Sequence, residues 1–123
     1  MYYTKTHEWL KPIGGNLARI GISKQGIEEL GTIEFMELPA IGTSIKHEAP
    51  FAQIESTKVS SDLYAPVSGE VTEVNAELSS EIHLLNSDPE GAGWLAVIRL
   101  DSLESLATLM TEESYKQYIA GET

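Results

Sequence analysis

The sequence predicts a mainly β domain in which two antiparallel sheets form a sandwich or flattened barrel, with short helices at its margins. Three observations support this prediction. The chain has 123 residues, 41% of them hydrophobic and 22% charged, which suits one globular domain spanning residues 1–123. Short segments of alternating hydrophobicity recur between turn residues. The tetrapeptide Pro-x-x-Gly also occurs at Pro39–Gly42 and again at Pro66–Gly69, which suggests two similar β halves.

Five segments are predicted as strands because apolar side chains alternate along them. In Leu17–Ile22, for example, Ala18, Ile20 and Ile22 share one face. The last segment, Trp94–Leu100, is apolar on both faces, so we expect it to be buried on both sides. The other three segments are Ile33–Leu38, Phe51–Glu55 and Val67–Val74.

Three helical stretches interrupt the strands. Ser23 is a suitable N-cap for a short helix that ends at Gly31, because serine accepts a backbone hydrogen bond at a helix start and glycine tolerates the conformation that ends one. A second stretch covers residues 103–110, and Thr111 is a suitable N-cap for a third. The apolar stripes, which we expect to pack on the core, are Ile27 and Leu30; Leu103, Leu106, Ala107 and Met110; and Tyr115, Tyr118 and Ile119.

The chain is strongly acidic, since 8 Lys and Arg residues stand against 19 Asp and Glu residues and give a net charge of −11. Binding to nucleic acid or to an anionic membrane needs clustered basic side chains, so both are disfavoured, whereas basic patches on larger proteins suit this charge. The longest apolar run, Trp94–Ile98, is too short to span a bilayer. Because its start shows no targeting segment, we expect the chain to be soluble and cytoplasmic.

The sequence contains none of the usual catalytic arrangements. The chain has no cysteine, which excludes disulfides, cysteine-ligated metals and a cysteine nucleophile. His7, His47 and His83 show no metal-binding spacing, and neither a serine-nucleophile motif nor a phosphate-binding loop is present. An autonomous enzyme and a metal site are therefore disfavoured, and any redox chemistry requires a bound or attached cofactor.

The most informative segment is Ile54–Val71, which surrounds a lone lysine. Lys58 stands among small and hydroxylated residues, between two strand-like runs. This arrangement presents one amine at the tip of a hairpin, where no basic neighbour competes with it. An exposed lysine is usually only a solvated charge, so the argument for a functional lysine depends on the whole segment.

This segment closely resembles the lipoyl-attachment region of the glycine cleavage system H-proteins. The shared motif is Glu55-Ser56-x-Lys58, followed by S-D-L-Y-A-P-x-S-G-E-V. The resemblance covers nearly the whole chain and implies a lipoyl-domain-like β-sandwich with lipoate joined by an amide to Lys58. Other matching positions are His7-Glu8-Trp9, Glu37-Leu38-Pro39 with Gly42, and Asn86 with Asp88-Pro89 and Gly93-Trp94-Leu95.

The resemblance implies a non-catalytic carrier. In this family, the lipoyl arm takes the aminomethyl group of glycine from the pyridoxal-phosphate decarboxylase component to the tetrahydrofolate-dependent aminomethyltransferase, and it passes electrons to dihydrolipoyl dehydrogenase. A lipoate ligase or lipoyl transferase would modify Lys58. The resemblance also implies that the loaded arm folds into a surface cleft beside polar residues that match Thr6, Glu8 and Asp62.

Other functions fit parts of the same sequence. An H-like protein that acts as a lipoyl relay or donor for other lipoylated enzymes would carry the same motif, and departures from the family pattern favour it. A biotin carrier is disfavoured because Thr57 and Val59, in place of methionines, flank the lysine. A lipoyl domain of a 2-oxo acid dehydrogenase is disfavoured as well, and a bare Lys58 in cells would indicate an unmodified interaction domain. The departures are Lys24, Glu34, Ile82 and Glu90.

Overall fold

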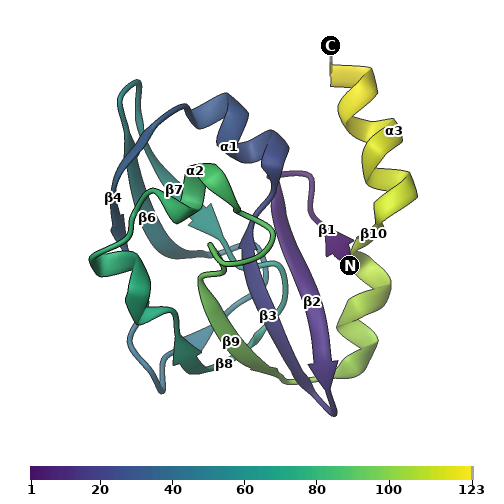
Figure 1. Cartoon of the computed structure of the whole chain (residues 1–123). Helices are drawn as coiled ribbons and strands as arrows, with labels where there is room; N and C mark the ends of the chain where they lie inside the picture. Colours follow the sequence, from purple (N-terminus) through teal and green to yellow (C-terminus); the bar gives the residue numbers. More distant parts are fainter. Residues whose placement is uncertain (123) are drawn as a thin grey trace.

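The structure, a computed structural model, describes residues 1–122 and contains two antiparallel sheets (Figure 1). The larger sheet has seven strands in the order β10-β1-β2-β3-β9-β8-β5, and the smaller has three in the order β4-β6-β7. The strands are β1 (Tyr2–Tyr3), β2 (Glu8–Gly14), β3 (Leu17–Ile22), β4 (Ile33–Glu37), β5 (Ser44–Ile45), β6 (Pro50–Ser56), β7 (Ser60–Tyr64), β8 (Gly69–Val74), β9 (Ala96–Leu100) and β10 (Met110–Thr111). The predicted fold class is confirmed, and because neither sheet closes on itself the arrangement is a sandwich.

The helices are short and lie around the sheets (Figure 1). They are the α-helices α1 (Lys24–Leu30), α2 (Leu84–Ser87) and α3 (Glu112–Glu122), and the 3-10 helices η1 (Ala76–Ser79) and η2 (Leu103–Thr108). None of the helices within residues 1–122 is long and apolar enough to cross a membrane.

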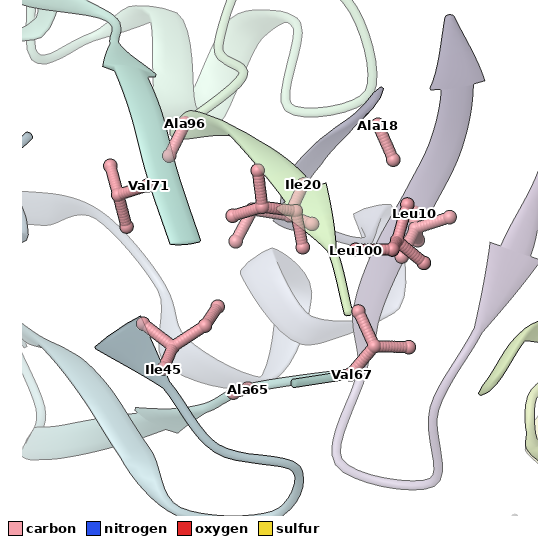
Figure 2. Packing of buried hydrophobic residues seen from close by; sticks show 10 residues of the cluster. Leu10, Ala18, Ile20, Ile45, Ala65, Val67, Val71, Ala96 and Leu100 are labelled. Carbon is pink, nitrogen blue, oxygen red and sulfur yellow. The ribbon is translucent and has the colours of Figure 1, made fainter. Parts of the chain in front are cut away.

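The first core cluster is built by the alternating apolar residues of the larger sheet (Figure 2). The register sets Ala18 opposite Ile98 and Ile20 opposite Ala96, and all four side chains are fully buried. Val97, on the other face of β9, is also buried. The prediction that this strand is buried on both sides therefore holds at Val97 but not at Arg99, which shares its face and is exposed. The cluster is completed by Leu10, Ile45, Ala65, Val67, Val71 and Leu100.

The two Pro-x-x-Gly segments lead into strands that pair with each other. Pro39–Gly42 precedes β5, and Pro66–Gly69 enters β8. The two strands are antiparallel, with Ser44 opposite Glu70, and the Gly42 N–H donates to the carbonyl of Val71 at 2.8 Å. The repeated tetrapeptide thus marks two related positions at one edge of the larger sheet.

The first and third predicted helices are confirmed, together with their caps. Ser23 Oγ accepts the backbone N–H of Gly26 at 3.1 Å. Helix α1 ends at Gly31, whose φ of 86° lies in the region that favours glycine. Thr111 Oγ1 accepts the N–H of Ser114 at 3.2 Å at the start of α3.

The predicted helix over residues 103–110 is only partly correct. Leu103–Thr108 form the 3-10 helix η2, which buries no residue, and Met110 and Thr111 form strand β10. In this strand, Met110 lies opposite Tyr3 of β1. Because this pairing requires an extended backbone, a helix cannot continue through these two residues.

Helix α3 holds the N-terminal segment through an aromatic cluster. The rings of Tyr3 and Tyr115 stack with centroids 4.3 Å apart. The Tyr115 hydroxyl lies 2.6 Å from His7 Nδ1 and 2.7 Å from Ser23 Oγ. His7 has a φ of 71° in the turn between β1 and β2, and the next residue, Glu8, begins β2. The cluster therefore holds the turn that positions Glu8.

We predict that Gly69→Ala destabilises the protein by about 2–3 kcal/mol, because an added Cβ overpacks the contact between β8 and β9. That atom would lie 3.1 Å from the carbonyl carbon of Arg99 and closer still to its oxygen. Chemical denaturation measures the change. The control is Gly121→Ala, where a Cβ meets nothing within 4 Å and we expect a gain of about 0.5 kcal/mol. Equal effects at the two sites would contradict the packing argument.

Candidate functional site

Lys58 lies at the tip of the β6–β7 hairpin, as the sequence predicts. The Ser56 N–H donates to the carbonyl of Val59 at 2.9 Å, which leaves Thr57 and Lys58 as the two residues of the turn. The hairpin extends beside α1 at the top of the molecule (Figure 1). Lys58 is exposed, and no ion pair with another residue in the described part of the chain engages it.

A single buried hydroxyl organises the tip. Ser56 is only 8% exposed, and its Oγ accepts the backbone N–H groups of Lys58 and Val59, each at 3.2 Å. The same hydroxyl donates to the carbonyl of Val59 at 3.3 Å. Because the side chain of Ser56 satisfies the backbone of the turn, the side chain of Lys58 is left to project from it.

The loop between α1 and β4 supports the tip from one side. Thr57 N–H donates to the carbonyl of Thr32 at 3.0 Å. Gly31 lies under the aliphatic stem of Lys58, since a Cβ added there would be 3.4 Å from Cε. Asn86 holds this loop, because its Nδ2 donates to the carbonyl of Gly31 and its Oδ1 accepts the N–H of Ile33, both at 2.9 Å.

These features fit an amide-linked acyl group on Lys58. The amine is exposed, its backbone is fixed, and its stem lies over a glycine that leaves it room. Glu55, the other residue of the predicted attachment motif, is exposed one residue before Ser56, and it lies opposite Ser60 in β7 and Phe35 in β4.

The structure brings two of the three predicted cleft residues together. Thr6 and Glu8 line a cavity of about 550 Å³ that also includes Tyr64. Thr6 Oγ1 donates a short hydrogen bond to Glu8 Oε1. Asp62 lies instead on the exposed side of β7 and lines a second cavity of about 480 Å³. Neither cavity has Lys58 in its lining.

Glu8 is a buried carboxylate with several donors. It is 2% exposed, and it also accepts a hydrogen bond from Thr4 Oγ1 at 2.7 Å. The N–H of Tyr64 approaches its other oxygen at 3.5 Å. Burial raises the pKa of Glu8 above its ordinary value, and the hydrogen bonds from Thr6, Thr4 and Tyr64 oppose that rise.

Thr4 is a site residue that the sequence did not indicate. Its hydroxyl accepts the N–H of Glu8 at 3.1 Å while it donates to the carboxylate of the same residue. The two groups meet only because the chain turns back at His7, whose positive φ no local pattern signals. The hydroxyl of Thr4 therefore orients Glu8 from both its backbone and its side chain.

The three histidines do not come together. His7 is buried against Tyr115, and its Nε2 lies 3.3 Å from Glu29 Oε2. His47 and His83 are exposed beside Glu48 and Glu81 respectively. Within the described residues, no group of three histidine or acidic side chains could hold a metal ion.

We predict that Ser56→Ala loosens the hairpin tip, because the N–H groups of Lys58 and Val59 lose their acceptor. The expected loss of stability is about 1–2 kcal/mol. Hydrogen exchange followed by NMR should show faster exchange at these two amides. Ser60→Ala is the control, because the Ser60 hydroxyl is exposed and bonds no described residue. Unchanged protection in the Ser56 variant would contradict the assigned role.

We predict that Glu8→Gln changes how the stability of the protein depends on pH. Because the pKa of Glu8 is raised in the folded protein, folding favours the protonated acid. The free energy of unfolding therefore falls as pH rises from the unfolded pKa of Glu8 through its folded pKa. Glutamine cannot ionise, so the variant should gain stability relative to the unaltered protein between about pH 4 and pH 7. Denaturation at both pH values measures this gain. The control is Glu73→Gln at an exposed position, and a Glu8 variant that behaves like it would refute the prediction.

Comparisons with known proteins cover nearly all of the described chain, and all of them point to one family. The family model for the glycine cleavage H-protein matches residues 1–122. The glycine cleavage system H protein of Coprothermobacter proteolyticus is 47% identical over 117 residues, covering 95% of this chain and 92% of that protein. The protein of the same name from Mycobacterium tuberculosis is 46% identical over 122 residues, covering 94% and 91%. A crystal structure of an H protein from Mycobacterium marinum superposes with a TM-score of 0.83 at 32% identity, covering 98% of this chain and 94% of the other. The chain belongs to the glycine cleavage H-protein family.

Proposed function

We propose that residues 1–123 form one carrier domain whose Lys58 is the attachment point for lipoate. The observation that carries the proposal is the exposed amine at a hairpin tip whose backbone is held by Ser56, within the attachment motif of the family. A lipoyl group supplies a redox-active disulfide when bound, which this cysteine-free chain does not provide itself. The chain is then a carrier component without catalytic residues of its own.

The partners follow from the same proposal. The chain would carry the aminomethyl group of glycine from the pyridoxal-phosphate decarboxylase component to the aminomethyltransferase component, and electrons to dihydrolipoyl dehydrogenase. A lipoate ligase or lipoyl transferase would attach the group. Gly31 and Thr32 would serve this role by keeping the hairpin tip rigid, so that motion is concentrated in the side chain of Lys58.

The cavity beside Glu8 is the proposed cleft for the loaded arm. A cationic amine entering it would need an anionic partner, because burial of an unpaired charge is costly. Glu8 supplies a carboxylate, while Thr4 and Thr6 hold that carboxylate in place. Asp62 lies on β7 between the hairpin tip and Tyr64, and its proposed contact with the arm would be made outside the cavity.

We predict that Lys58→Arg abolishes lipoylation, because a guanidinium group does not form the amide. Intact mass measurement and peptide mapping of protein from its native cells should show one lipoyl-sized increase on the Lys58 peptide, and none in the variant. Lys46→Arg, at another exposed lysine, is the control and should keep the full increase. A lipoyl load that persists in the Lys58 variant would show that the attachment site is elsewhere.

A further inference from the structure

The three-stranded sheet presents an exposed side on which the proposed carrier function involves only Asp62 and the attachment-motif residue Glu55. Residues that lie opposite one another in a sheet share a face, and the register sets Phe35 opposite Glu55 and Glu55 opposite Ser60. In the next row across the three strands, Gln53 lies opposite Glu37 on one side and opposite Asp62 on the other. All six residues are exposed. We call them the outer face: Phe35, Glu37, Gln53, Glu55, Ser60 and Asp62.

An aromatic ring lies on this face. Phe35 is 55% exposed, and a side chain of this size usually packs against an apolar neighbour. The face then continues past Glu37 and Asp62 into the cavity of about 480 Å³, whose lining includes Leu38 and Phe51. An aromatic side chain beside a partly apolar hollow is a feature of protein interaction sites.

The charge of this sheet has one sign. Strands β4, β6 and β7 contain no Lys, Arg or His. Their acids are Glu34, Glu37, Glu55 and Asp62. Within residues 1–122, no ion pair engages any of them. Unpaired exposed carboxylates attract a basic surface, and complementary charge both steers its approach and selects it over other surfaces.

The outer face ends at Lys58. On one side of the hairpin tip, the loop with Gly31 and Thr32 lies against the turn and the stem of Lys58. The residues of the outer face are exposed up to this tip. A macromolecule that reaches Nζ of Lys58 across this sheet therefore covers Phe35 and the acids around it.

We propose that the outer face docks the enzyme that acylates Lys58, through a basic surface that surrounds an apolar recess for Phe35. This inference rests on the proposed function. In the reaction, the bond between Nζ and the lipoyl acyl carbon forms, the bond from that carbon to its activating group breaks, and Nζ loses a proton. The enzyme brings the activated acyl group, so the chain supplies only the amine and the docking surface.

The experiment measures how fast a lipoate ligase modifies the unlipoylated chain, followed by intact mass. Phe35→Ala should raise KM about tenfold with kcat little changed, since the loss of one well-packed aromatic contact corresponds to a tenfold weaker affinity. The variant Glu37→Lys, which reverses one charge of the outer face, should also raise KM at low salt. Because salt screens exposed charges, this second effect should shrink at high salt.

Matched controls exist on η2, away from this sheet. Leu103 is also 55% exposed, and Glu104 is an exposed acid, so Leu103→Ala and Glu104→Lys should leave KM within about twofold. Face variants that behave like these controls at every salt concentration overturn the docking proposal but leave lipoylation of Lys58 intact.

Two further outcomes are decisive. A concentration-dependent dimer in sedimentation that Phe35→Ala abolishes would assign the outer face to a second copy of the chain, against the proposal. A ligase that modifies a reference lipoyl domain but leaves Lys58 of the unaltered chain bare would overturn the proposed function, and the docking proposal with it.

Discussion

The position of Lys58 depends on how the backbone of a tight turn finds its hydrogen-bond partners. A strand ladder stops at a hairpin tip, and the N–H groups there need acceptors from elsewhere. Ser56 Oγ accepts those of Lys58 and Val59, and the carbonyl of Thr32 accepts that of Thr57. Because the backbone of the tip is held in this way, the side chain of Lys58 is the part of the turn left free to carry a group. Asn86 extends the same support by holding the loop that contains Thr32.

The parts of the fold that the sequence predicts correctly are those with local causes. Strands β3 and β9 show alternation along a few residues, and α1 has both of its caps in the sequence. Strands β1 and β10 have only two residues each and show no such signal, and β10 is held in its sheet by pairing with β1, as between Tyr3 and Met110. The same non-local contact shortens the helix expected over residues 103–110. Alternation within a segment cannot indicate a partner from the other end of the chain.

In the candidate site, too, local features are predicted from the sequence and non-local contacts are not. The hairpin and its lysine are predicted from one continuous segment, whereas the contacts of Thr4 with Glu8 depend on a turn that only the folded chain shows. Two departures from the family pattern, Glu90 and Lys24, are in contact, although only the backbone of Lys24 takes part. Glu90 Oε2 accepts the backbone N–H of Lys24 at 2.9 Å, and Oε1 accepts the hydroxyl of Tyr3 at 2.8 Å. Burial and the Glu90 carboxylate raise the pKa of Tyr3, which keeps its hydroxyl a donor.

The charged residues of the strands are distributed unevenly between the two sheets. The strands of the larger sheet hold three acids and three bases, and two of these, Glu70 and Arg99, pair at 3.1 Å. The strands of the smaller sheet hold four acids and no base. Amide formation on Lys58 would remove the one positive charge at the end of this sheet, because an amide nitrogen does not ionise. A partner that meets the loaded chain would then face a more negative surface than the enzyme that loads it, so a basic partner surface becomes more favourable after modification.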